Sequence, residues 1–302
     1  MKLPPIAVAL TLAASASPVG AETLDPSDPV DAHKIRQRIH CTGEMNTAGA
    51  TGLSGSVYSR RQGEKDRLIF KVEGIGINRC MPISDPVRGE GYRVVNREIV
   101  FYLDPETGEI VDRWENPWTG ETVDVIHIAN DPVSGNIWPR DEEGKPYPLE
   151  VVQKGEWAFV QNIFPLFYHN PMGGDYQDYV GGKYHAMEMF TYVALADRLL
   201  SVEDKGASPT TAWTRVSDWM PWMKMRGREG AVIFNAVAAP LPGGTADLPP
   251  AILKEIQTKY PVYLDAPPAD DVRPNDTTWT VNKRAIDAQR AAEGTTPDTS
   301  GH

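Results

Sequence analysis

The stretch that decides the fold is residues 99–139, IVFYLDPETGEIVDRWENPWTGETVDVIHIANDPVSGNIWP. Short strand-like segments alternate in it with turns at near-even spacing. The tripeptide TGE at 107–109 recurs at 119–121, and the dipeptide DP at 104–105 recurs at 131–132. Glycine adopts the positive φ that tight reversals between strands need, and proline fixes φ within a turn. This spacing predicts an antiparallel meander.

Working outward, strand-like segments also flank this stretch, at 57–61 (VYSRR), 67–77 (RLIFKVEGIGI) and 151–169 (VVQKGEWAFVQNIFPLFYH). An open antiparallel sheet exposes unpaired N–H and C=O groups at its edges, so such sheets close on themselves or are covered. We therefore predict one mainly β domain over residues 22–286, in which the meander closes into a calycin- or lipocalin-like barrel with an interior that can hold a ligand.

Two helices are predicted at the ends of this domain. Residues 31–39 (DAHKIRQRI) fit a short helix that packs Ile35 and Ile39, and residues 248–259 (LPPAILKEIQTK) begin with prolines and align apolar side chains on one side. Residues 287–302 are polar and contain Pro, Thr and Gly. This composition predicts a disordered tail.

The N-terminus has the layout of a secretory signal. Lys2 precedes an apolar run, and the small residues Val19 and Ala21 precede Glu22. This order predicts a signal peptide over residues 1–21 that is cleaved after Ala21, and a periplasmic or secreted mature protein. An ordinary buried helix is the alternative. No other apolar stretch approaches the ~20 residues of a membrane span, so we expect none.

The charge balance bears on partners. The net charge is −11, and removal of residues 1–21, which contain Lys2 and no acid, makes it −12. Such a chain is not expected to bind nucleic acid or anionic membrane surfaces. Its two cysteines, Cys41 and Cys80, lack metal-ligand spacing, and an oxidising compartment favours a disulfide between them over two free buried thiols.

His127 is a first candidate for chemistry. It follows Val123 and Val125 on one strand face, which suits either a structural histidine or a catalyst, and Asn130 lies near the same rim. Its partner depends on the hairpin register. A four-residue loop (116–119) places Asp112 on its face, and a five-residue loop places Arg113 and Glu109 there. A carboxylate would raise the basicity of the imidazole, and an arginine would lower it.

Glu188 is a second candidate. Residues 183–195 fit a strand better than a helix in this β context, and Tyr184, Phe190 and Tyr192 then share a face with Glu188. Desolvation by such neighbours raises a carboxyl pKa toward the range of acid/base catalysis. The alternative is an interior ion pair with Arg79 or Arg215, and the two interpretations are compatible.

Three tryptophans cluster at residues 213–223, in WTR (213–215) and WMPWM (219–223). With methionines and Arg215, they can form a polarizable wall for an aromatic ligand, or they can plug one end of a barrel. No dinucleotide, Walker or HExxH motif is present, and no cofactor is expected. No metal is expected either, although His127, His169 and His185 leave a zinc site open as an alternative.

Several longer motifs are uncommon. They are YxDPxTG at 102–108, WxNPxTGE at 114–121, HIANDPV at 127–133, and WTR with WMPWM at 213–223. On these motifs the chain resembles the domain of unknown function 1838 family over residues 31–279. The resemblance implies a soluble β-rich protein of bacteria or fungi. It carries no settled reaction, so no catalytic role transfers with it.

These observations favour a protein that handles a small hydrophobic molecule, aromatic or terpenoid, as a cofactor-independent lyase or isomerase. Glu188 or His127 would move the proton, while Tyr184 and Arg215 would stabilise negative charge. The alternatives are a lipocalin-like binding protein and a structural partner in the envelope. The sequence leaves oligomerisation open. The expected substrate-binding residues are Trp213, Trp219, Trp222, Asn130, Arg79 and Tyr168.

Overall fold

The computed structural model describes residues 22–41, 44–169, 172, 183–203 and 207–294. The protein is mainly β and antiparallel, which confirms the predicted class. The strands are β1 (Ala48–Arg60), β2 (Arg67–Asp85), β3 (Gly89–Leu103), β4 (Arg113–Glu115), β5 (Thr122–Asp124), β6 (Ile128–Asn130), β7 (Gly135–Ile137), β8 (Val152–Lys154), β9 (Trp157–His169), β10 (Lys183–Leu195), β11 (Thr210–Ser217) and β12 (Ala231–Pro240).

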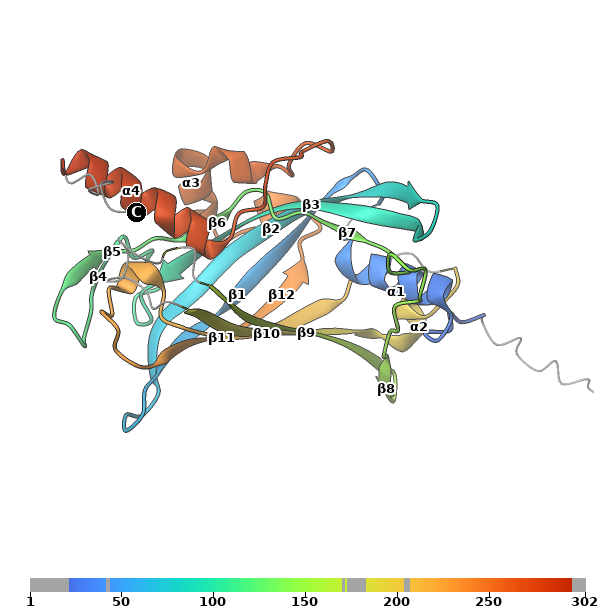
Figure 1. Cartoon of the computed structure of the whole chain (residues 1–302), viewed down its shortest axis with the longest axis horizontal. Coiled ribbons are helices and arrows are strands. Elements are labelled where there is room, and N and C mark those ends of the chain that lie inside the picture. Colours follow the sequence, from blue (N-terminus) through green and yellow to red (C-terminus); the bar gives the residue numbers. More distant parts are fainter. Residues whose placement is uncertain (1–21, 42–43, 170–171, 173–182, 204–206, 295–302) are drawn as a thin grey trace, which may run out of the picture.

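Within those residues, ten strands form one sheet in the order β6-β3-β2-β1-β12-β11-β10-β9-β8, with β7 also paired to β3. The strands β4 and β5 form a separate hairpin. Figure 1 shows that the sheet curls strongly, so that β9, β10 and β11 lie below β1, β2 and β3. In the described part of the chain no ladder joins β8 to β6, so strand pairing does not close the predicted barrel.

The curl requires close approach of neighbouring strands at two glycines. A Cβ on Gly74 would lie 2.2 Å from the carbonyl oxygen of Ile99, and one on Gly55 would lie 2.4 Å from the Cβ of Ala236. Both distances are shorter than real Cβ contacts, so only glycine fits there. The register of β1 against β2 also shifts between Val57 and Tyr58, a bulge-like irregularity that increases local twist.

Alternation along the strands gives the sheet an inner and an outer face. On the inner face, Phe70 of β2, Tyr102 of β3 and Phe234 of β12 join one buried cluster. On the outer face, Ile75, Ile99 and their neighbours pack against α3 (Pro250–Lys259), the predicted C-terminal helix. Each large apolar side chain buried in this way contributes about 1.5–3 kcal/mol.

One end of the curled sheet holds α1 (Pro29–His40), which confirms the predicted N-terminal helix (Figure 1). The helix begins where the Asp28 carboxylate accepts the N–H groups of Val30 and Asp31. Its Ile35 and Ile39 pack against inner-face residues of β9 and β10. The predicted Cys41–Cys80 disulfide is present, with Cα atoms 5.8 Å apart, and ties the end of α1 to β2.

Helix α4 (Thr278–Ala292) is the main element that the sequence did not predict. It begins with a capping box between Thr277 and Thr280, and it extends past residue 287, where we predicted a disordered tail. Residues 295–302 and the predicted signal peptide lie outside the described residues. Trp279 and Ile286 of α4 join Tyr184 of β10 in one buried cluster, and α4 also contacts β6. This helix therefore contacts two strands, β6 and β10, that lie far apart in the strand order.

The remaining helical elements are short: α2 (Ala196–Leu199), η2 (Pro221–Met223), η3 (Gly244–Asp247) and η4 (Pro261–Leu264). Among the described residues, we find no helix with the length and apolar character that a membrane crossing requires.

Candidate functional site

The inner face carries an ion pair in apolar surroundings. Glu188 of β10 lies directly opposite Arg215 of β11, and the Arg215 Nη1 atom lies 3.5 Å from Glu188 Oε1. A second nitrogen of Arg215, Nη2, donates a hydrogen bond to the Tyr184 hydroxyl. The side chain of Arg215 is only 8% exposed, whereas that of Glu188 is 23% exposed. Glu188 is therefore the member of this group that solvent or a ligand can reach.

Arg215 continues a row of directly opposed residues across the sheet. Its neighbour on β12 is Phe234, which faces Val57 on β1, which in turn faces Phe70 on β2. The guanidinium carbon lies 6.0 Å from the centres of both the Phe234 and the Tyr184 ring. At this distance the aromatic faces favour the buried positive charge.

A second carboxylate approaches from the other side of the curl. Glu98 of β3 accepts a hydrogen bond of 2.7 Å from Asn130 Nδ2. Burial raises the pKa of Glu98; the Asn130 hydrogen bond lowers it, the charge of Glu188 raises it, and Arg215 lowers it. Four strands separate β3 from β10 in the sheet order, so these charges act on one another across the interior. The net effect of this setting is a pKa above the ordinary carboxyl value, with burial as the main cause.

Buried polar atoms without partners surround these charges. Among the described residues, Arg215 Nε and Trp213 Nε1 have no hydrogen-bond partner. Burial raises the pKa of the Tyr102 phenol, although the charge of Arg215 opposes this.

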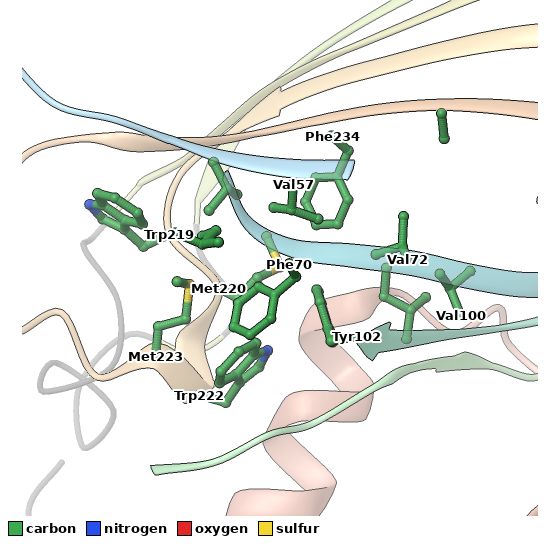
Figure 2. Close-up of a cluster of buried hydrophobic side chains, with 14 of the residues drawn as sticks. Val57, Phe70, Val72, Val100, Tyr102, Trp219, Met220, Trp222, Met223 and Phe234 are labelled. Atoms are coloured by element: carbon green, nitrogen blue, oxygen red, sulfur yellow. The ribbon is translucent and has the colours of Figure 1, made fainter. Parts of the chain in front are cut away.

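The tryptophan-rich segment lies at the end of the sheet opposite α1. Trp222 packs against Phe70 and Tyr102, with ring centres 5.8 and 5.2 Å apart, and Figure 2 shows Trp219, Met220 and Met223 beside them. Trp219 Nε1 donates to the carbonyl of Arg228 at 3.1 Å. Trp219 and Trp222 are therefore core residues, in the arrangement of a plug. Trp213, by contrast, sits on the inner face next to the site.

His127 is not brought together with Glu188. Its Nδ1 accepts the Tyr102 N–H at 3.2 Å, and burial lowers its pKa to about 4. The charges that act on it are those of Asp112, Glu255 and Lys259, from the α3 side of the sheet. The imidazole is thus neutral at pH 7. The described contacts of His127 are with Phe101 and Tyr102, and none of them joins it to Glu188, so a role for His127 in moving the proton stays a prediction.

The hairpin register differs from both alternatives that the sequence offered. Arg113 pairs with Asp124 and Glu115 with Thr122, which leaves a loop of residues 116–121. The Asn116 side chain fixes this loop by donating to the carbonyl of Met223 at 2.7 Å and accepting the N–H of Trp118 at 2.9 Å. Asp112 is nevertheless the acid whose charge acts most on His127.

Arg79 does not join the site. It alternates with Ile75 and Ile77, whose side chains belong to the outer-face cluster, so it points away from Glu188. Its place as a possible partner of Glu188 is taken by Arg215. Asn130 does lie in the site, because its side chain donates a hydrogen bond to Glu98. Tyr168 pairs with Tyr184 through its backbone, but its side chain is outside the described residues.

The histidines proposed as an alternative zinc site are spread over different elements. His127 lies between β5 and β6, His185 lies on β10, and the side chain of His169 is not described. Among the residues whose placement is described, no three His, Cys, Asp or Glu side chains gather in a way that could hold a metal ion.

Glu98 is the site residue that the sequence analysis missed. It alternates with Val100 and Tyr102 on β3, so it is a carboxylate beside two buried apolar positions of one strand face. The same signal singled out Glu188, and it could have found Glu98 as well.

Comparison with known protein families gives a match over most of the chain. A family model described as a protein of unknown function (DUF1838) matches residues 50–286. That range includes Glu98, Tyr184, Glu188 and Arg215, and it leaves out α1 and Cys41. No curated protein matches the chain.

Proposed function

The chain belongs to the DUF1838 family, and from that premise and the geometry of the site we propose that the inner face binds a small hydrophobic molecule and catalyses proton transfer on it. The reaction class is a cofactor-independent elimination or isomerisation. The observation that carries the proposal is the pair of carboxylates, Glu98 and Glu188, arranged around Arg215 in an apolar interior.

The two carboxylates have different surroundings, which suits them to opposite roles. Glu188, paired with Arg215 and partly exposed, acts as the base that removes a proton from a carbon next to a carbonyl group. Glu98, whose pKa is raised by burial, returns a proton at a second carbon or gives it to a leaving group. Proton number is conserved in both cases.

Arg215 and Tyr184 stabilise the negative charge that forms on the carbonyl oxygen. Burial raises the pKa of the Tyr184 phenol, which keeps it a hydrogen-bond donor at neutral pH, although the charge and hydrogen bond of Arg215 oppose this shift. The guanidinium is always charged, and it is held by partners on the same face.

The ligand is hydrophobic, aromatic or terpenoid. Trp213, Phe190 and Phe234 lie beside Arg215, with the rings of Trp213 and Phe190 stacked at 6.3 Å. In this proposal the curled sheet serves as a calycin-like container whose open side is covered by α4. The Cys41–Cys80 disulfide supports a location outside the cytoplasm, with residues 1–21 as the signal peptide.

The first experiment is native mass spectrometry of the protein purified from its own periplasm, followed by denaturation and identification of any released molecule. A bound hydrophobic carbonyl compound, or the α,β-unsaturated carbonyl compound that elimination would form from it, would support the proposal. Turnover is then measured for Glu188→Gln and Glu98→Gln, with Glu90→Gln as control, since Glu90 is an exposed carboxylate with a serine partner. Unchanged turnover in both site variants would overturn the proposal.

A lipocalin-like binding protein is the second candidate. The observation that favours it is that Arg215 already pairs with Glu188 and Tyr184, so these charges can serve as a neutralised structural group. The two candidates separate in one comparison. In an enzyme, Glu188→Gln lowers kcat more than ligand affinity, whereas in a pure binder Trp213→Phe weakens affinity and Glu188→Gln leaves it nearly unchanged.

A further inference from the structure

The outer face of the sheet has a groove that takes no part in the proposed reaction. Its volume is about 500 Å³, and it lies between strands β1, β11 and β12 and the segment that joins η3 to α3. Ser54 of β1 pairs in register with Glu73 of β2 and with Val237 of β12, and the adjacent Leu53 and Ala236 face inward. The groove and Glu188 are therefore on opposite faces of the sheet.

The lining of the groove is mostly apolar and small. Leu241 and Leu248 form one wall, and residues of β11 and β12, including Ala212 and Ala239, form the floor. Val237 is 63% exposed there, which is unusual for an apolar strand residue. Pockets for small molecules have volumes of about 300–1,000 Å³, mostly apolar walls and a few polar groups. This groove meets each of these criteria.

The charged groups of the groove are of one sign. Glu73 and Asp247 line it, and no lysine or arginine does. The Glu73 carboxylate accepts a hydrogen bond of 2.6 Å from Ser54 Oγ, and in the described part of the chain no cation pairs with it. Burial raises the pKa of Glu73, which the Ser54 hydrogen bond opposes. A half-buried carboxylate beside apolar walls suits a ligand that carries both a positive charge and an apolar body.

We propose that this groove is a second binding site, for a small hydrophobic ammonium ion whose charge pairs with Glu73 and whose apolar body covers Val237 and Leu241. The proposal goes beyond the function of the inner face and does not depend on it. Asp247 adds negative potential at the rim, so anions of the same shape are excluded.

The test uses three small molecules that share a six-carbon body and differ in their polar group: hexylammonium, hexanol and hexanoate. Titration calorimetry on the full chain measures the affinity of each. We expect hexylammonium to bind about tenfold more tightly than hexanol, because a charge-assisted hydrogen bond is worth roughly one decade or more, and hexanoate to bind more weakly than both. Glu73→Gln removes this preference, while Glu90→Gln, which removes an exposed carboxylate with a similar serine partner, retains it.

A second variant locates the site. Val237→Trp fills the groove from an exposed position, so it abolishes hexylammonium binding without altering the core. Thermal unfolding confirms that each variant is folded. Equal affinity for hexylammonium and hexanol, or undiminished hexylammonium binding by either Glu73→Gln or Val237→Trp, would overturn the proposal. Failure of the inner-face reaction would not affect it.

Discussion

At the scale of residues, Arg215 determines most of the electrostatics of the inner face. It pairs with Glu188, donates to Tyr184 and acts on the pKa values of Glu98 and Tyr102. Removing Arg215 would leave the buried acidic and phenolic groups without the positive charge that stabilises them. Breaking one half of a buried ion pair costs far more than the intact pair contributes, since a charge remains in a medium of low polarizability.

We therefore expect Arg215→Met to lower the free energy of unfolding by about 3–5 kcal/mol, measured by urea denaturation. The matched control is Arg113→Met, because the Arg113–Asp124 pair is 3.6 Å long and both side chains are at least 60% exposed. An exposed pair of this kind contributes about 0–1 kcal/mol. Equal effects of the two substitutions would show that Arg215 is not a buried charge centre.

His127 gives a prediction about pH. Its folded-state pKa is about 4, below the ordinary 6.5, so the unfolded chain binds more protons between these values. Stability contributed by the neutral histidine is present above pH 6.5 and is lost as the pH falls toward 4. The loss is as much as about 3 kcal/mol.

This contribution is isolated by His127→Gln, which can still accept the Tyr102 N–H. The difference in unfolding free energy between wild type and variant should shrink when denaturation is repeated at pH 4.5 instead of 7.5. His33 and His40, whose pKa values burial also lowers to about 4, remain in both proteins and cancel. A difference that does not change with pH would mean that the imidazole is solvated.

At the scale of elements, the disulfide joins α1 to β2 across 39 residues of sequence. A cross-link over a loop of this length restricts the unfolded chain and stabilises the fold by roughly 4 kcal/mol. The free energy of unfolding of the Cys41→Ser/Cys80→Ser double variant, measured by urea denaturation, should therefore be lower than that of the wild type by this amount. Reduction of the wild type should reproduce the loss. A change of less than about 1 kcal/mol would show that α1 docks without it.

Element identity follows from sequence mainly where periodicity is strong. The long strands, α1 and α3 were predicted because their apolar alternation or their capping signals are local. The hairpin register was not, since the Asn116 side chain fixes the loop through Met223, more than a hundred residues away in the sequence. Helix α4 was missed because its buried residues, Trp279 and Ile286, are diluted by polar ones, and its partner surface exists only after the sheet has formed.

In the candidate site, too, local relations could be predicted from the sequence, and relations between distant segments could not. Tyr184 and Glu188 were predicted to share a face because they alternate along one strand, and Arg215 was one of two possible partners of Glu188; the structure adds that β10 and β11 pair directly. The relation of these residues to Glu98 was not predicted, since β3 and β10 are brought opposite each other by the curl of the whole sheet.

At the scale of the molecule, α4 contacts strands that lie far apart in the sheet. It is the element that contacts both β6 and the residues of β10, at opposite parts of the strand order. Trp279 packs edge-on against Tyr184, with ring centres 4.7 Å apart. Tyr184 in turn holds Arg215. The Trp279–Tyr184 contact thus connects helix α4 to the hydrogen bond between Tyr184 and Arg215.

This linkage predicts two effects of Trp279→Ala. Loss of a fully buried tryptophan should destabilise the fold by about 3–5 kcal/mol, and amide hydrogen exchange should rise first in residues 184–188 and 128–130, before β1 and β2. Gln289→Ala, on the same helix but only partly buried, is the control and should alter neither quantity. If exchange rose equally over the sheet, α4 would be an ordinary part of the core. Local exchange confined to β6 and β10 would instead identify the helix as the cover of the site, because opening it exposes the inner face while the remaining ladders stay intact.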